Sequence, residues 1–217
     1  MNNLLHAISY LIVIRIIVQV MLGHNVRNEE RLPSKGPAII VLNHRSYWDS
    51  LLLLSLLPEN SVSSLNTFST TEYFSQKPLV AWFYQSIMGI EPLKPTSTPI
   101  ANKATTNPLQ PCLEALSNDK IVILFTDEHL SEQEQPSEFR DNLSQLALAY
   151  PYTPIVPVEL HGLGNELPKD RTLFTPSFCD LFIGQPVFGS SHEGDFNQQL
   201  NNSMGQLNEE VHKAGWE

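Results

Sequence analysis

Residues 37–57 read PAIIVLNHRSYWDSLLLLSLL and decide the fold, because a strand and a helix follow each other there across a short polar loop. The segment PAIIVL, residues 37–42, is a continuous apolar run after a Gly-Pro break, which is typical of a strand buried on both faces. The apolar run YWDSLLLLSLL, residues 47–57, stops before Pro58 and predicts a helix. A buried strand that leads directly into a helix is the repeating unit of α/β proteins.

The same alternation of apolar runs and helical segments continues along the chain. Further strands are predicted at 63–68, 89–93, 120–125, 154–160 and 177–183, and helices at 71–87, 109–116, 139–150 and 196–213. This order indicates an α/β fold, with a mostly parallel central sheet covered by helices. Ligands of such sheets bind beyond the carboxyl ends of the strands. We therefore expect the functional residues in the segments that follow the apolar runs.

The N-terminal segment Leu4–Leu22 contains 19 mostly aliphatic residues without glycine or proline. A helix of this length matches the thickness of a bilayer core, but Arg15 near its centre would cost roughly 2.5–3.5 kcal/mol on insertion. Two interpretations stay open: a helix in the membrane interface whose arginine reaches the headgroups, or a core helix packed on the domain. We favour the first, with residues 1–30 as an N-terminal membrane-associating helix and linker and residues 31–217 as the globular domain.

Charge and cysteine content narrow the class of protein. The formal net charge of -10 argues against nucleic acid as a partner. Residues 1–57 carry five basic and three acidic side chains, so an anionic lipid surface would attract this end of the chain. Cys112 and Cys179 belong to no C-x-x-C pair, which favours small core residues in a reducing compartment over a metal cluster or disulfide. We expect a membrane-associated protein on the cytoplasmic face.

His44 leaves the predicted strand and Asp49 opens the predicted helix. Imidazole, with an unperturbed pKa near 6.5, is the natural base for taking a proton from a hydroxyl group, and a carboxylate on its other nitrogen fixes the tautomer. Five residues turn about 500° on one helix, so the pairing requires His44 in the loop, Ser46 as N-cap and a helix that starts at Tyr47. A capping box from Ser46 to Asp49 explains the same residues without chemistry. Both interpretations stay open on these residues alone.

NHRSYWD, residues 43–49, resembles the N-H-x4-D motif of the glycerolipid acyltransferases, the family of lysophosphatidic acid and glycerol-3-phosphate acyltransferases. The resemblance covers roughly residues 30–190 and continues, in order, through MGIEPLKP at 88–95, KIVILFTDEHLS at 120–131, FRDNLSQLA at 139–147 and TPIVPVELHG at 153–162. The matches of NHRSYWD and TPIVPVELHG are specific, whereas MGIEPLKP is a weak match.

The resemblance implies different roles for the individual motif residues. His44 would deprotonate the acceptor hydroxyl and Asp49 would orient His44. The co-substrate would be a fatty acyl thioester of coenzyme A or acyl carrier protein, with no cofactor and no metal, and membrane lipids would be partners. Substrate-binding roles would fall to the remaining motif positions: Asn43, Ser46, Lys94, Asp127, Arg140, Thr153, Pro154 and Pro157. Lys94 would meet an acceptor phosphate or headgroup as a point charge.

The segment FTDEHLS, residues 125–131, departs from the F-P-E-G-T-R-S pattern of the family. Leu130 replaces the arginine and so removes a bidentate phosphate ligand, while Glu128 occupies the glycine position. These changes weaken the case for a phosphomonoester acceptor and favour a neutral, zwitterionic or amine-bearing headgroup. The adjacent Asp127, Glu128 and His129 do not predict a metal site, because neighbouring residues rarely converge on one ion.

Three functions remain in competition. The first is an O-acyltransferase that moves a fatty acyl group to the hydroxyl of lysophosphatidic acid or a related lysolipid. The second is a catalytically inactive lipid- or partner-binding member of the same fold, motivated by the altered residues 125–131. The third is a thioesterase or lipase that uses the same histidine, although the chain has no G-x-S-x-G elbow for a serine mechanism. We favour the first, because the histidine and the carboxylate are both retained.

Overall fold

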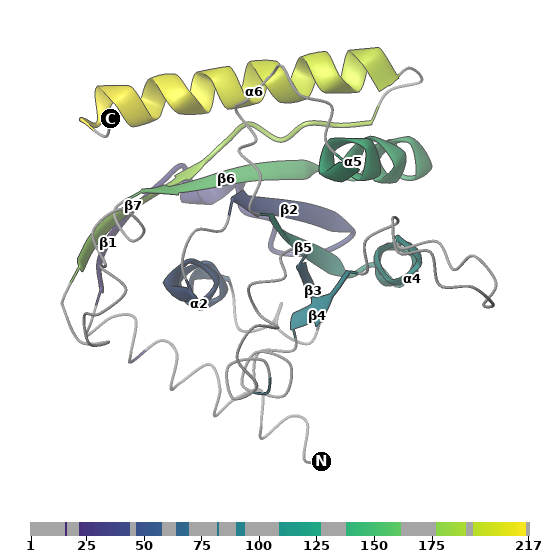
Figure 1. Ribbon diagram of the computed structural model, residues 1–217, viewed down its shortest axis with the longest axis horizontal. Coiled ribbons are helices and arrows are strands. Elements are labelled where there is room, and N and C mark those ends of the chain that lie inside the picture. The colour runs from purple at the N-terminus through teal and green to yellow at the C-terminus, as the bar shows by residue number, and fades with distance from the viewer. Residues whose placement is uncertain are drawn as a thin grey trace.

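The computed structural model describes residues 16, 22–43, 47–57, 64–69, 82, 90–93, 109–126, 138–161, 177–189 and 193–215. The strands are β1 Leu22–Arg27, β2 Ala38–Asn43, β3 Leu65–Ser69, β4 Ile90–Pro92, β5 Ile121–Thr126, β6 Ile155–His161 and β7 Ser177–Ile183. The helices are the 3-10 turn η1 Glu29–Arg31, α2 Tyr47–Leu56, α4 Gln110–Ser117, α5 Glu138–Ala149 and α6 Glu193–Lys213. These elements build one sheet with helices on both faces (Figure 1), which confirms the predicted α/β class.

The seven strands lie in the order β1-β7-β6-β2-β5-β3-β4. From β6 to β4 every neighbouring pair is parallel. β7 runs antiparallel to β6, and β1 runs parallel to β7. Parallel neighbours need long crossover connections, and α4 and α5 occur in the connections that lead into β5 and out of it. The prediction of a mostly parallel sheet is therefore confirmed.

The first five residues of the central strand β2 are all apolar, and their burial explains why. Its side chains alternate between two buried clusters, with Ala38, Ile40 and Leu42 on the face of α2, and Ile39 and Val41 on the face of α4, α5 and α6. All five residues have an exposed fraction of 0%. Figure 1 shows α2 on one side of the sheet and α6 on the other. The sheet is thus the middle of three layers, and no face of β2 is left for a polar side chain.

Pro157 lies inside the sheet, between β2 and β7, where proline is uncommon. Its carbonyl oxygen accepts a hydrogen bond from the Gly184 backbone N–H at 2.9 Å, just past the end of β7. Because the N–H and C=O of a strand residue point to the same side, the N–H that proline lacks belongs to the β7 side and costs the β2 pairing nothing. A Cβ on Gly184 would lie 2.8 Å from the Pro157 Cγ atom, so the glycine makes room for the ring.

Strand β1 pairs with β7 from Leu22↔Ser177 to Arg27↔Phe182. The sequence analysis placed these residues in the N-terminal helix and linker, so the folded unit starts earlier than residue 31. The polar residues of β1 interrupt the apolar run that would have predicted a strand there. The rest of the predicted helix Leu4–Leu22 lies outside the described residues, except for Ile16, which is helical and 56% exposed. Within the described part of the chain, no helix has the length and hydropathy needed to cross a membrane.

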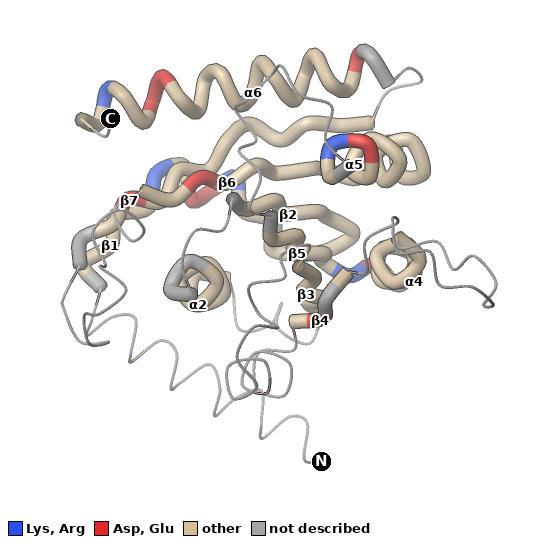
Figure 2. The backbone as a smooth tube through the Cα atoms, viewed as in Figure 1, with Lys and Arg blue, Asp and Glu red and all other residues tan. Residues whose placement is uncertain are grey.

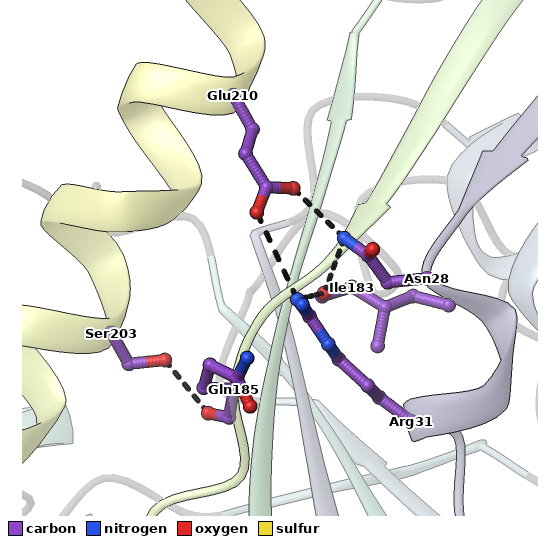
Figure 3. Close-up of polar contacts among 6 residues, drawn as sticks. All are labelled: Asn28, Arg31, Ile183, Gln185, Ser203 and Glu210. Atoms are coloured by element: carbon purple, nitrogen blue, oxygen red, sulfur yellow. Dashed lines mark hydrogen bonds and ion pairs between the residues drawn. The ribbon is translucent and has the colours of Figure 1, made fainter.

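A polar cluster, which we call the α6 clamp, joins the C-terminal helix to the segment after β1 (Figure 3). It consists of Asn28, Arg31, Glu210 and the Ile183 carbonyl group. Asn28 Nδ2 donates to Glu210 Oε2 at 2.8 Å, and Arg31 Nη1 donates to the Ile183 oxygen at 2.8 Å. Arg31 Nη1 also lies 3.9 Å from Glu210 Oε1. The clamp therefore fixes the end of α6 to residues more than 150 positions earlier in the chain.

Candidate active site

The carboxyl ends of the parallel strands meet at one edge of the sheet. The register pairs Asn43, the last residue of β2, with Thr126, the last residue of β5. On the next strand Ser69 pairs with Phe125, and Ser69 also pairs with Pro92 of β4. This edge is where a ligand of a parallel α/β sheet binds. The segments that follow β2, β4 and β5, which contain His44, Lys94 and Asp127, begin within two residues of it.

The histidine motif lies at this edge. Strand β2 ends at Asn43 and α2 begins at Tyr47, which is the start that the His44–Asp49 pairing requires. Asp49 is the third residue of α2 and so belongs to its first turn. His44 and Ser46 fall between the two elements and lie outside the described residues, as do the side chains of Asn43 and Asp49. The pairing of His44 with Asp49 therefore stays a prediction.

Two other predicted ligands follow directly from strands of the same edge. Lys94 comes two residues after β4, and Asp127 comes immediately after β5. Both lie outside the described residues, so their roles also stay predictions. β5 is the direct neighbour of β2, whereas β4 lies two strands beyond β5, at the border of the sheet. The topology thus brings three of the selected segments to one place, although they are far apart in the sequence.

Thr153 and Pro154 lie at the opposite edge of the sheet. They precede β6, and the Pro154 carbonyl accepts a hydrogen bond from the Ile39 N–H at the beginning of β2. The residue of β6 that lies level with Asn43 is Glu159, one past the registered pair Leu42↔Val158. Thr153 is six positions before Glu159, or roughly 20 Å away at 3.3 Å per residue. The structure does not bring these two residues together with Asn43, and Pro157 lies between the two edges. Their predicted role in substrate binding stays a prediction.

Arg140 lies on α5 and is half-buried. Its Nη1 atom donates to the Oδ1 atom of Asn201 on α6 at 2.9 Å. Close by, Ser144 Oγ is 3.3 Å from Asn197 Oδ1, which makes a second polar contact between the same helices. The structure shows Arg140 engaged in packing α5 against α6, and nothing described places it beside Asn43.

The end of β6 carries a buried acid and histidine that the sequence analysis did not select. Glu159 has an exposed fraction of 7%, and its Oε1 atom lies 3.1 Å from Nε2 of His161. The two residues are two positions apart on one strand, so their side chains share a face. They are the fourth-last and second-last residues of TPIVPVELHG, where an acid and a histidine occupy alternate positions of an apolar strand. That alternation was the available signal.

Charged groups of two neighbouring strands surround this pair. Asp180 of β7 pairs with His161 in the register, and its Oδ2 atom lies 3.7 Å from Nη2 of Arg27 on β1. The Phe182 ring stands edge-on to His161, with centroids 6.1 Å apart, and the Arg27 guanidinium lies 5.3 Å from the same ring centroid. Figure 2 shows both acidic and basic positions where β1, β7 and β6 run side by side. We call Arg27, Glu159, His161, Asp180 and Phe182 the β6 end cluster.

The two cysteines are core residues, as predicted. Cys112 of α4 and Cys179 of β7 are both buried and unoxidised. Desolvation by burial raises the pKa of the Cys112 thiol from 9.0 to about 12, against a smaller opposing effect of a backbone hydrogen bond. A thiol that stays protonated at neutral pH is a poor nucleophile, so Cys112 is unsuited to covalent catalysis.

Comparison with known proteins identifies a matching protein family and a solved structure with a similar fold. A model of the acyltransferase family matches residues 23–161, a range that runs from β1 through β6. The chloroplast 1-acyl-sn-glycerol-3-phosphate acyltransferases of Arabidopsis thaliana and Brassica napus are 29% and 27% identical over 168 residues. These residues cover 76% of this chain but only 44% and 45% of the relatives, so the match spans less than half of the full length of each relative.

Among solved structures, the fold resembles the crystal structure of the 1-acyl-sn-glycerophosphate (LPA) acyltransferase PlsC from Thermotoga maritima. The TM-score is 0.63 at 23% sequence identity, and the match covers 95% of this chain and 81% of that chain. At this level of identity the likeness supports the architecture of the sheet and its covering helices. It leaves the chemistry to be argued from the residues at the strand ends.

Proposed function

We propose a function from the premise that this chain belongs to the acyltransferase family: it moves a fatty acyl group from a thioester to the hydroxyl of lysophosphatidic acid or a related lysolipid. One observation carries the proposal. The segment NHRSYWD begins at the carboxyl end of the central strand β2, and α2 starts at Tyr47, three residues after the histidine. This arrangement of strand, loop and helix is the one that lets an imidazole in the loop meet a carboxylate in the first helical turn.

The proposed chemistry needs one base and one positioning group. His44 takes the proton from the acceptor hydroxyl while the oxygen attacks the thioester carbonyl carbon. Collapse of the tetrahedral intermediate breaks the carbon–sulfur bond, and the leaving thiolate takes the proton from the imidazolium. Asp49 holds the tautomer of His44 and stabilises its charged form. The N-terminal turn of α2 starts at the same edge, and unpaired N–H groups there favour the negative charge that develops on the carbonyl oxygen.

The substrate class follows from the names of the relatives together with the apolar N-terminal segment. Those relatives are named for 1-acyl-sn-glycerol-3-phosphate. We propose a donor of the acyl-coenzyme A or acyl carrier protein type, without a further cofactor. We also propose that the segment Leu4–Leu22 associates with the cytoplasmic face of a membrane, where a lysolipid resides.

The test is a thiol-release assay with the purified full chain, acyl-coenzyme A or acyl carrier protein, and a panel of lysolipids. Wild-type protein should release thiol in an acceptor-dependent manner. His44→Ala should lower kcat by about 10²–10⁴-fold, the range that a general base contributes. His212→Ala, which removes an exposed histidine in the last turn of α6, is the matched control and should leave the rate unchanged.

Two outcomes would contradict the proposal. The first is the absence of thiol release with every donor and acceptor, together with binding of the protein to lipid vesicles, as an inactive lipid-binding relative would show. The second is thiol release that does not depend on an acceptor, with free fatty acid as the product, which would assign the histidine to thioester hydrolysis. Mass spectrometry of the lipid product separates esterification from hydrolysis.

A further inference from the structure

Glu159 presents a polar atom that the described fold leaves unsatisfied. The side chain is more than nine-tenths buried, and its Oε1 atom faces His161. The other oxygen, Oε2, has no hydrogen-bond partner among the residues that the structure describes. Leaving a buried acceptor unpaired costs about 1–3 kcal/mol, and more for a charged group, so most buried polar atoms have partners. A donor is therefore expected to reach this oxygen.

The position of Glu159 in the sheet connects it to the proposed reaction. The last registered pair of β2 and β6 is Leu42↔Val158. Glu159 is one residue further along β6, and Asn43 is one residue further along β2, so the two occupy adjacent strands at the same level. Neighbouring strands lie about 4.8 Å apart. Asn43 immediately precedes His44, and a carboxylate side chain at this place is therefore within reach of a molecule bound at the strand ends.

The charges of the β6 end cluster determine what kind of molecule fits. The carboxylate of Asp180 already faces the Arg27 guanidinium at 3.7 Å, and the same guanidinium lies over the Phe182 ring. The group that faces Glu159 is the imidazole of His161, which stands against the edge of the same aromatic ring. A phosphomonoester would bring its own negative charges to a buried carboxylate. A headgroup with an N–H or O–H donor would instead supply the missing hydrogen bond.

We propose that Glu159, positioned by His161, is a headgroup-binding residue that selects an acyl acceptor bearing an N–H or O–H donor over a bare phosphomonoester. This inference rests on the proposed acyltransferase function and specifies its acceptor. The loss of an arginine at Leu130 in the segment 125–131 points in the same direction, because it removes a planar phosphate ligand. The two observations are independent, since one concerns β6 and the other the loop after β5.

The experiment compares three acceptors, two of which have the same charges and differ in whether the ammonium nitrogen carries hydrogens or methyl groups. Lysophosphatidylethanolamine carries an ammonium group with three N–H donors, whereas lysophosphatidylcholine carries the same charges without one, and lysophosphatidic acid serves as the phosphomonoester. In wild-type protein kcat/KM should be at least tenfold higher for the ethanolamine lipid than for the other two. Glu159→Gln should reduce that preference to within about twofold, mainly through KM. His161→Gln should reduce it partly, as expected for a positioning residue.

Controls separate binding from folding and from the proposed function itself. Glu209→Gln removes an exposed carboxylate on α6 and should keep the wild-type preference. Glu159→Asp retains the charge and should keep part of the preference, which covers the case in which the glutamine variant does not fold. A second measurement needs no turnover: the ethanolamine lipid, below its micelle concentration, should raise the Tm of wild-type protein more than the choline lipid does, and Glu159→Gln should abolish the difference.

Each result decides between the two proposals. Turnover with an acceptor preference that is the same in wild-type and Glu159→Gln protein overturns the inference and leaves the acyltransferase function standing. Absence of turnover with all acceptors overturns the function, and the Tm comparison then decides the role of Glu159 alone. Equal stabilisation of wild-type protein by the two lipids overturns the inference, and it would assign the Glu159 oxygen to a partner within the chain.

Discussion

Replacing Glu210 by alanine should weaken the protein measurably, although its carboxylate side chain is 37% exposed. Two contacts of the α6 clamp are lost, the Asn28 Nδ2 hydrogen bond at 2.8 Å and the Arg31 ion pair at 3.9 Å. Arg31 keeps its hydrogen bond to the Ile183 carbonyl, so the guanidinium still has a hydrogen-bond acceptor. The loss is therefore expected to be local to α6 and its contact with the segment after β1.

The magnitude follows from weighing three effects. A hydrogen bond to a charged group contributes about 1.5–3 kcal/mol when well buried, and partial exposure here reduces it to roughly 1 kcal/mol. The ion pair at 3.9 Å adds about 0.5 kcal/mol for the same reason. Against these stands a gain of about 0.3–0.5 kcal/mol, because an acid in the last turn of a helix opposes the helix dipole. The net destabilisation is about 1 kcal/mol, or a Tm decrease of about 2–4 °C for a chain of this size.

Urea unfolding followed by circular dichroism measures the difference against a matched control. Glu209 is the preceding residue of the same last turn, is 73% exposed and faces only Lys213 at 3.5 Å, so Glu209→Ala should change stability by less than about 0.5 kcal/mol. A double-mutant cycle with Asn28→Gly isolates the hydrogen bond, because glycine tolerates the left-handed backbone of Asn28 at φ 62°. Equal effects of the two glutamate substitutions, or additivity in the cycle, would refute the reasoning.

Three further substitutions test the packing. Gly205→Ala in α6 should stabilise the protein by about 0.5–1 kcal/mol in urea unfolding, because nothing lies within 4 Å of the new Cβ and glycine is a poor helix former. Gly36→Ala should destabilise it by at least 1–3 kcal/mol, roughly the cost of overpacking, because the Cβ would lie 2.6 Å from the Lys120 carbonyl carbon. Cys112 has a folded-state pKa of about 12 and an unfolded value near 9.0. The unfolded chain thus loses its thiol proton first, stability should fall between those pH values by up to about 1.4 kcal/mol per unit, and Cys112→Ala should flatten that dependence.

The sequence predicted most of the sheet because its strands are buried on both faces. The apolar runs at 37–42, 120–125 and 154–160 became β2, β5 and β6 with ends shifted by one residue. The predicted helix start at Tyr47 is confirmed, because the polar loop before it leaves little room for another boundary. Strand β1 was missed because half of its positions face solvent at the sheet border, and His24, Asn25 and Arg27 there interrupt any apolar period.

The candidate site was predicted in part, and the reason is topological. Residues that follow parallel strands converge whatever their sequence separation, so the loops after β2, β4 and β5 could be grouped from the strand predictions alone. Thr153 and Pro154 were grouped with them by motif resemblance. These two residues precede the amino end of β6, however, whereas Glu159 and His161 lie at its carboxyl end. The acid and the histidine were overlooked because each alone is unremarkable in an apolar strand. Only the register shows that Glu159 lies level with Asn43, one residue past the pair Leu42↔Val158.

The two borders of the sheet also bear on how the protein behaves at high concentration. An open strand offers its backbone to a second molecule and can seed aggregation. β4 is three residues long and ends in Pro92, which leaves little backbone to pair with. β1 is longer, but its alternating polar and charged side chains resist such stacking. The short length of β4 and the polar side chains of β1 should thus disfavour the addition of a strand from a second molecule at either border of the sheet.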